Sequence, residues 1–489
     1  MKKVLCILLV ILLAIPLVAC QTEREHSGKE QSGVVSNDVS GDGKELRSFP
    51  LETTVWNETI TVLCADNQLY SISQISAEEQ TTEPVNDAFY NRNAFIKENF
   101  GLTITPLIVQ NNDEIVSTLR NNYTSGIEEF QAVAASLSYL KTTALEGILY
   151  DINDVSNIDT TNEWWDQSAV RDLTLMDKLW YLTGDIFVED DEATWAMYFN
   201  KDLINEHNLE NPYDLVRKNE WNIDKMAEMI KSVHLMNGDK MSFDPEVGDV
   251  FGMVAQTYDL YCFMIGSNQP MIYNDGKNVQ LRIGAEDNIS TFNRLFEILA
   301  DTNNVGIAEV DGTKGIEHEQ KYKIFTNGNA LFMTGAISVV SNEFMRDANI
   351  HYGILPLPKK NQSQESYTTT MTPFWSTFIA IPTTNVQKLD ATTYCLEAMA
   401  YYSKKMVTHE YYDRTLNLKR LQDEDSSEML EIIFANRNYD LGCVYNFNSC
   451  LFQYSWILSS RENTLVSKFD SIKSGIEMEI EKLLEQVED

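Results

Sequence analysis

Apolar and polar positions follow one another in blocks near the start of the chain, and these blocks predict strands and helices in turn. Thr59–Ala65 is β-branched and apolar, which predicts a buried strand. Val85–Phe100 carries apolar residues at helical spacing and precedes Gly101, where a helix C-cap belongs. Leu102–Val109 predicts a second strand, and Pro106 places that strand at an edge or a bulge.

The same alternation continues to a third strand. A helix is predicted from Asp113 to near Gly126, and Phe130–Ala135 predicts the third strand. This β-α-β-α-β order predicts a parallel sheet with right-handed crossovers. Ligands of such sheets lie beyond the carboxyl ends of the strands. We therefore expect Asp66, Asn67 and Ser136, which follow the first and third strands, to bind the ligand.

Elements of both kinds continue to the end of the chain, and no internal repeat is found. About 440 residues exceed what one hydrophobic core usually holds, so two lobes are expected. Further strands are predicted at Trp195–Asn200, Ala330–Met333, Tyr352–Leu357 and Phe378–Ile381, and further helices at Lys201–Asn208, Asn222–Gly238, Phe292–Leu299, Glu319–Thr326, Gln387–Met406 and Ser467–Val487.

The first residues have the layout of a secretory signal. Lys2 and Lys3 form a basic head before the apolar run Val4–Val18. That run is shorter than the roughly 20 residues that a helix needs to cross a bilayer. Its end, Leu17-Val18-Ala19-Cys20, resembles a bacterial lipobox, in which the cysteine is acylated and becomes the first residue after cleavage. The alternative is an ordinary signal peptide with a chance cysteine.

The stretch after the signal is predicted to be a flexible tether. Gln21–Ser48 is rich in Ser, Gly, Glu, Lys, Asn and Asp, so it cannot bury enough apolar surface to become ordered. We therefore divide the N-terminal part into a signal peptide at residues 1–19 and a lipid-anchored tether at residues 20–49. The expected location is the outer, extracytoplasmic face of the cell membrane, with attachment through lipid on Cys20.

Charge and cysteine content narrow the possible partners. The formal net charge is −35, which repels nucleic acid and anionic lipid, so neither is expected as a partner. The cysteines of the body lack CxxC spacing and are odd in number, which argues against a disulfide framework or a zinc site. Buried free thiols are expected at Cys64, Cys262, Cys395, Cys443 and Cys450, although Cys443 and Cys450 remain a possible pair.

The sequence shows no catalytic motif. GxSxG, GxxxxGK[ST] and HExxH are all absent, and we expect no cofactor and no metal. Carboxylate pairs for glycoside hydrolysis remain open, because the 73 acidic residues supply such pairs by chance. The acidic run Glu189–Glu192 is interpreted as a solvated loop, and a cation site or the mouth of a cleft is the alternative. We expect a binding protein and not an enzyme.

Four segments resemble the extracellular solute-binding proteins of bacterial ABC importers, in the cluster that contains many carbohydrate binders. The first is Met197–Ile204, which is similar to a family strand that ends in Tyr-Asn-Lys-Asp-Leu. The others are Gly147–Asp154, Phe325–Phe332 and Tyr352–Pro358, which occur in the family's order. The resemblance spans roughly residues 58 to 405. The region after Met406 matches no pattern of the family.

This resemblance implies a two-lobe α/β fold of the type II periplasmic-binding-protein kind, with hinge crossings and a ligand between the lobes. The crossings are expected near Trp180–Asp185, Thr334–Ala336 and Ser376–Ile381. Carried onto this sequence, lobe 1 comprises residues 50–184 with 336–378, and lobe 2 comprises residues 185–335 with 379–489.

The expectation of a sugar ligand rests on the aromatic residues. Sugars offer apolar C–H faces to Trp and Tyr rings, while their hydroxyl groups need polar partners. Arginine is sparse near the candidate positions, which argues against a phosphate or dicarboxylate ligand. Besides the strand-end residues, the candidates are Trp164, Trp165, Trp180, Trp195, Trp375 and Trp456, together with Gly335, whose small size would let backbone approach a ligand.

The sequence thus predicts a lipid-anchored, monomeric solute-binding subunit of an ABC importer. It would capture a carbohydrate, of the oligosaccharide class, and deliver it to the transmembrane subunits of the permease. Two alternatives remain open at this point. The same fold could serve as an extracellular sensor coupled to a membrane kinase, or the protein could be a surface glycan hydrolase.

Overall fold

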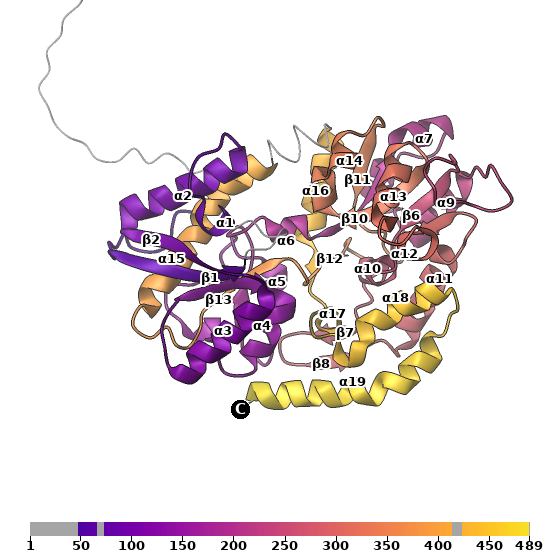
Figure 1. Ribbon diagram of the computed structural model, residues 1–489. Coiled ribbons are helices and arrows are strands. Elements are labelled where there is room, and N and C mark those ends of the chain that lie inside the picture. Colours follow the sequence, from indigo (N-terminus) through magenta and orange to yellow (C-terminus); the bar gives the residue numbers. More distant parts are fainter. Residues whose placement is uncertain (1–46, 66–72, 413–422, 489) are drawn as a thin grey trace, which may run out of the picture. The chain divides into compact units, whose positions relative to one another are not determined.

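The computed structural model describes residues 47–65, 73–412 and 423–488 (Figure 1). The predicted signal peptide, Cys20 and most of the predicted tether lie outside these residues. Two five-stranded sheets organise the described part of the chain. We refer to the first sheet with the helices packed on it as lobe 1, and to the second sheet with its helices as lobe 2.

The first sheet has the strand order β2-β1-β3-β13-β4. β1 (Glu58–Ala65) runs parallel to β2 (Leu102–Val109) and to β3 (Ala132–Ser136), as the sequence predicts. β13 (Thr377–Ala380) is antiparallel to β3 and to the short β4 (Tyr181–Leu182). β2 lies at the edge, where its proline removes no hydrogen bond of a central strand.

Helices cover both faces of the first sheet, and Figure 1 shows α2 and α15 on one face and α3 and α4 on the other. The predicted caps are present, because Gly101 and Gly126 end α2 and α3 with φ values of 65° and 66°. Polar side chains begin these two helices, since Glu83 and Asn111 each accept a backbone N–H of the first turn. The bounds are Pro84–Phe100 for α2, Asn112–Ser125 for α3, Leu137–Ala144 for α4 and Leu389–Ser403 for α15, with the short α1 at Ser73–Ser76.

The second sheet has the strand order β11-β5-β10-β6-β9. β10 (Ala330–Ala336) lies at its centre, parallel to β6 (Phe251–Ala255) and antiparallel to β5 (Trp195–Asn200). β9 (Val305–Ile307) pairs with β6, and β11 (Tyr352–Leu355) pairs with β5. β5, β6, β9 and β10 are wholly buried, which explains their unbroken apolar sequences.

Asparagine side chains begin three successive helices of lobe 2. Asn200, Asn211 and Asn222 accept backbone N–H groups at the starts of α7, α8 and α9. These caps mark where the three helices begin, at the end of β5, before Pro212 and after Trp221. The helices of this lobe are α7 (Lys201–Glu206), α8 (Pro212–Arg217), α9 (Ile223–Ser232), α10 (Asp259–Gly266), α11 (Glu286–Leu299), α12 (Ala308–Asp311), α13 (Glu317–Thr326) and α14 (Glu343–Arg346).

The strand pairing corrects the expected division of the chain. Residues 336–378 were assigned to lobe 1, but β11 within this range pairs with β5 in the second sheet. β13 extends into the range 379–489 that was assigned to lobe 2, yet it pairs with β3, and α15 contacts β1 and α2. The chain therefore returns to the first sheet through residues 371–376 and not near Thr334–Ala336. A strand's apolar pattern shows that it is buried but not which neighbour it pairs with.

The first passage between the sheets, residues 183–194, corrects the interpretation of the acidic run. Glu189–Glu192 forms the short helix α6, and the side chains of Glu189 and Asp190 are buried. A solvated loop is therefore wrong for these two residues. Asp190 is buried because Arg437, from the far end of the chain, lies 3.2 Å from its carboxylate.

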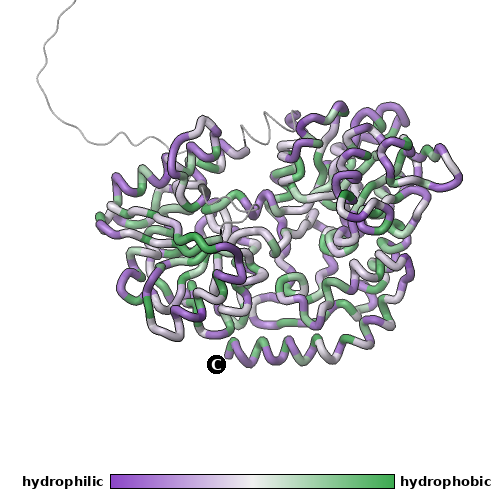
Figure 2. Tube along the Cα trace, in the orientation of Figure 1, coloured by the Kyte–Doolittle hydropathy of each residue, from purple (hydrophilic) through white to green (hydrophobic). Residues whose placement is uncertain are grey.

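The described part of the region after Met406, which matches no pattern of the family, forms helices and one short strand, and its last helix, Leu465–Glu488, confirms the helix predicted at Ser467–Val487. β14 (Arg437–Asn438) pairs in parallel with β12 (Thr369–Thr370), and neither strand belongs to a five-stranded sheet. Figure 2 shows hydrophobic and hydrophilic segments in alternation along the last helix, as expected for a helix that packs on one face. The helices here are α16 (Glu424–Ala435), α17 (Leu441–Tyr445), α18 (Cys450–Ser460) and α19 (Leu465–Glu488).

The structure bears on two further predictions, one about the state of the cysteines and one about membrane-spanning helices. Cys262, Cys395, Cys443 and Cys450 are buried free thiols, as expected, so Cys443 and Cys450 do not form the possible pair; Cys64 is buried as well. Among the described residues, no helix combines the length and the apolar character that crossing a membrane requires.

Candidate functional site

The carboxyl edge of the first sheet is rich in hydroxyl groups. Ser136 ends β3 opposite Thr377 of β13, and its side chain is fully buried with Oγ 3.2 Å from Oγ of Ser138. Thr183, just after β4, donates its hydroxyl to the carbonyl of Thr377 at 3.1 Å. The buried hydroxyl of Ser376 makes no hydrogen bond to another described residue. Asp66 and Asn67 lie outside the described residues, so their expected place at this edge stays a prediction.

One edge of the second sheet brings together two of the predicted residues. Trp195 begins β5 and pairs with Ala336, while Gly335 pairs with Ala196. A Cβ atom on Gly335 would lie 3.0 Å from Cγ2 of Val339, which is tight packing. The absence of a side chain at Gly335 therefore makes room for the side chain of Val339 in the same lobe.

Hydrogen bonds fix the indole ring of Trp195. Its Nε1 donates to Oδ1 of Asp259 at 2.7 Å, and the hydroxyl of Thr334 donates to the other carboxylate oxygen. Burial raises the pKa of Asp259 even though the ammonium group of Lys321 acts against this shift. Lys321 also donates to the carbonyl of Thr334 at 3.2 Å, which completes a buried polar network.

Two tyrosines that the sequence analysis did not select extend this aromatic edge. The ring of Tyr258 lies 5.2 Å from that of Trp195, and the ring of Tyr261 lies 5.3 Å from that of Tyr258. Both tyrosines follow the carboxyl end of β6 at Ala255. The rule that selected Ser136 would have selected this position too, had the strand Phe251–Ala255 been predicted from its sequence.

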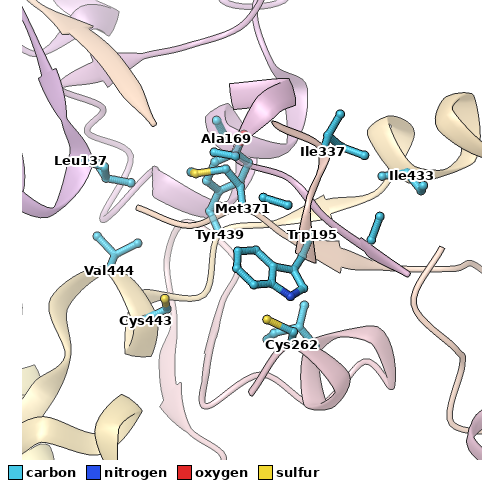
Figure 3. Close-up of a cluster of buried hydrophobic side chains, with 14 of the residues drawn as sticks. Leu137, Ala169, Trp195, Cys262, Ile337, Met371, Ile433, Tyr439, Cys443 and Val444 are labelled. Carbon is cyan, nitrogen blue, oxygen red and sulfur yellow. The ribbon is translucent and has the colours of Figure 1, made fainter. Parts of the chain in front are cut away.

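The segment 437–445 lies against the edges of both sheets. Figure 3 shows Leu137 from α4, Trp195 from β5 and Cys443 and Val444 from α17 among the side chains of one buried apolar cluster. The hydroxyl of Tyr258 lies 3.5 Å from Sγ of Cys443. Residues distant in sequence therefore meet where the two strand-end edges approach the same segment.

A cavity of about 770 Å³ lies beside this region and includes two of the predicted tryptophans, Trp164 and Trp165, in its wall. Both indole N–H groups donate to the carboxylate of Glu397, at 3.2 and 2.9 Å. Asn162 donates to the same carboxylate at 2.7 Å. Burial raises the pKa of Glu397 to about 7, against the effect of these donors. The two indoles are thus held by a buried acid and are themselves almost wholly buried.

Acidic residues outnumber basic ones around this cavity, and one arginine neutralises several of them. Arg437 lies 3.0 Å from Asp166, 3.2 Å from Asp190 and 2.8 Å from Asp191. Burial raises the pKa of Asp190 well above its usual value, although Arg437 opposes the shift. The charged wall residues are Glu163, Asp166, Asp185, Asp190, Asp191, Glu431, Lys404 and Arg437.

The remaining predicted tryptophans do not gather at one place. Trp180 is buried directly before β4, and Trp375 is half-buried directly before Ser376 at the hydroxyl-rich edge. Trp456 lies on the outer face of α18 with 55% of its surface exposed, and its ring lies 6.1 Å from that of Phe452. Trp456 is therefore separate from both strand-end edges.

Comparison with known proteins identifies the fold. No protein-family model matches the chain, and no curated protein matches it. Among solved structures, the chain is similar to a cyclo/maltodextrin-binding protein complexed with maltotetraose, with a TM-score of 0.57, 12% identity and coverage of 86% of this chain and 97% of that one. It is also similar to a sugar transporter from Rhizobium etli in an open conformation, with a TM-score of 0.56, 12% identity and coverage of 86% and 99%.

A third solved structure agrees with these two. The maltose-binding protein MalE of Listeria monocytogenes in complex with maltose has a TM-score of 0.54 and 14% identity, with coverage of 87% of this chain and 98% of that one. Two of these neighbours are described as sugar-binding proteins and the third as a sugar transporter, and nearly the whole length of each is matched by most of this chain. The chain therefore has the two-lobe α/β fold of solute-binding proteins, as the sequence resemblance implies.

Proposed function

We propose that this protein is an extracytoplasmic solute-binding subunit of an ABC importer and that it captures a carbohydrate between the strand-end edges of its two sheets. The observation that supports this most is the meeting of both edges at the segment 437–445, where Tyr258 contacts Cys443 and Leu137 packs with Val444. Ligands of parallel α/β sheets lie beyond such edges.

The side chains at the two edges suit a sugar. Trp195, Tyr258 and Tyr261 supply aromatic surface for apolar C–H faces, and Ser136 and Ser376 supply hydroxyl groups for polar contacts. Two of the compared proteins are described as complexes with maltotetraose and with maltose, which supports an oligosaccharide as the ligand class here. Trp375, Asp66 and Asn67 remain candidate contacts at the first edge.

Capture would use the passages between the lobes as a hinge, residues 183–194 and 371–376 among them. A ligand that touches both lobes binds best to the arrangement in which both lobes reach it, and so it shifts the population toward that arrangement. Residues 183–194 and 371–376 connect the lobes and would take up the change in backbone angles. A permease that recognises the loaded arrangement would then receive the sugar, and no covalent bond need change.

Lipid on Cys20 would keep the protein beside the permease. The basic head, the apolar run and the cysteine after Ala19 support this part of the proposal. Mass spectrometry of the protein purified from bacterial membranes tests it directly. A diacylglyceryl group on an N-terminal Cys20 is expected, and an unmodified chain that begins at a different residue would contradict it.

Isothermal titration calorimetry with linear and cyclic gluco-oligosaccharides of increasing length tests the ligand class. Saturable binding with a stoichiometry of one is expected for at least one member of the series. Because apolar ring faces and hydroxyl groups both contribute, affinity should rise from the disaccharide to longer chains. Absence of heat with every sugar, alongside binding of peptides or organic ions, would contradict the proposal.

A further inference from the structure

Helix α4 of lobe 1 and helix α17 of the C-terminal region are joined by polar contacts. The ammonium group of Lys141 donates a hydrogen bond of 2.6 Å to the carbonyl of Val444. The hydroxyl groups of Tyr181 and Tyr445 lie 3.3 Å apart, and Lys141 Nζ lies 5.9 Å from the ring centroid of Tyr445. All these partners belong to the chain itself, so the contact needs no ligand.

The side chain of Lys141 is half-buried where it meets α17. Burial lowers the pKa of Lys141, and the carbonyl that it reaches belongs to Val444, whose side chain is buried. Val444 lies in the last turn of α17, where carbonyl groups have no partner within the helix. The lysine therefore satisfies a carbonyl that would otherwise need water, and each group loses its partner if the helices separate.

Helix α17 is held on the lobe 2 side of this contact. The carboxylate of Asp440 accepts the backbone N–H groups of Met271 and Ile272 at 2.8 and 3.0 Å, and that of Gly442 at 2.9 Å. Met271 and Ile272 lie at the start of β7 (Ile272–Asn274), and β7 follows α10 of lobe 2. A bond from Lys141 to α17 consequently links lobe 1 to lobe 2.

The linked helices occupy the edge at which the ligand is proposed to bind. α4 starts directly after Ser136, and Leu137 of its first turn lies in the same buried cluster as Val444 and Trp195 (Figure 3). The exposed fractions of Ser136, Val444 and Trp195 are only 0%, 2% and 6%. A sugar could reach these residues only if α17 moved away from α4.

We propose that Lys141 and α17 form an internal latch that fills the ligand edge and competes with the sugar. The competition rests on the proposed function, whereas the latch itself is a contact within the chain. When only a fraction of the molecules is competent to bind, the apparent affinity is reduced by that fraction. Weakening the latch should therefore strengthen sugar binding, which is the reverse of what damage to a ligand contact would do.

The test compares Lys141→Met with the matched control Lys468→Met, which changes an exposed lysine on α19. Hydrogen–deuterium exchange of the full-length protein without sugar reports on the latch. Faster exchange is expected in residues 137–144 and 437–446 of Lys141→Met, with wild-type rates in the control. Tyr445→Phe, which removes only the hydroxyl contact, should give a smaller change in the same segments. Unchanged exchange in both latch variants would overturn the latch.

Calorimetry with maltotetraose reports on the competition. Because a hydrogen bond to a charged group is lost from the latched form only, Lys141→Met should bind on the order of tenfold more tightly than wild type. Weaker binding by Lys141→Met would overturn the competition and make Lys141 a ligand contact. If no variant binds any sugar, the proposed function fails, and the exchange rates still decide whether the latch exists.

Discussion

Arg437 of β14 and Asp166, which caps helix α5 (Gln167–Leu173), form a buried ion pair with 3.0 Å between Nε and Oδ2. The hydroxyl of Tyr439 donates to the same oxygen of Asp166 at 2.6 Å. Asp166 in turn accepts the backbone N–H groups of Ser168 and Ala169, which begin α5. The C-terminal region is thereby attached to a helix that precedes it by more than half the chain.

Replacement of Arg437 should be strongly destabilising. Arg437→Met would leave the carboxylates of Asp166, Asp190 and Asp191 buried without their common cation, and loss of one partner of a buried pair costs about 3–5 kcal/mol. Urea denaturation measures the change in the free energy of unfolding. Arg346→Met, which breaks an exposed pair with Asp347, should change it by less than about 1 kcal/mol. Equal effects of the two substitutions would contradict this account of the buried cluster.

The buried acid beneath Trp164 and Trp165 predicts a dependence of stability on pH. Burial raises the pKa of Glu397 to about 7 in the folded protein, whereas an unfolded glutamate has a pKa near its ordinary value. The protonated form is thus favoured by folding, and its contribution is present at low pH and is lost as the pH rises through about 7. Unfolding in urea at a series of pH values from about 5 to about 8 measures this loss of stability, because the interval includes most of the shift in the pKa.

The matched variant for this experiment is Glu397→Gln, which has no titrating group and places an amide where Trp164, Trp165 and Asn162 all donate. It should be less stable than wild type at low pH, and the difference between the two should shrink as the pH rises. A difference that stays constant over the whole series would contradict the shifted pKa of Glu397.

A backbone position beside the same tryptophans has no room for a side chain. Gly184 has φ +132°, and a Cβ atom there would lie 2.5 Å from the carbonyl oxygen of Trp164 and 2.7 Å from the backbone nitrogen of Asp166. Gly184→Ala should therefore cost more than the about 1–3 kcal/mol that strained backbone alone costs. Gly126→Ala is the control, because Gly126 has φ +66° with open space around it and should lose only about 1–2 kcal/mol. Similar midpoints of thermal unfolding for the two variants would count against this packing.

Replacement of Ser376 should change sugar affinity without lowering the stability of the protein. Its buried hydroxyl makes no hydrogen bond to a described residue, so Ser376→Ala should leave the free energy of unfolding unchanged or slightly raised. If the hydroxyl binds the sugar, affinity should fall about three- to tenfold, which corresponds to one neutral hydrogen bond. Ser467→Ala on the exposed side of α19 serves as the control in calorimetry. Wild-type affinity in Ser376→Ala would remove this residue from the proposed site.

The sequence predicts three strands of the first sheet and the two helices between them, because their signals are local. Apolar periodicity identifies β1, α2, β2, α3 and β3, and the caps at Gly101 and Gly126 mark where helices end. The sheet to which a strand belongs is a non-local property, so the pairing of Tyr352 with Asn200 had to come from the structure. This is why the expected division into lobes is wrong in its later segments.

The candidate site depends even more on contacts between residues that are distant in sequence, which local patterns do not reveal. Asp190 lies in a run that local composition marks as solvated, and it is buried by Arg437, 247 residues away. Lys141 and Val444 are separated by 303 residues, and neither has a local pattern that indicates the other. Trp195 and Trp456 were both selected by residue type, and the structure places Trp195 at a strand-end edge and Trp456 on an exposed helix face. Their contact with a ligand stays a prediction.

A crystal structure of the protein with maltotetraose tests the central claim most directly. We predict the sugar between the two strand-end edges, with a ring against Trp195 or Tyr258 and a hydroxyl group within hydrogen-bond distance of Ser136 or Ser376. Helix α17 should then have moved away from Lys141. Sugar bound elsewhere, such as on the exposed face of Trp456 and Phe452, with the two edges still packed as they are here, would contradict the account.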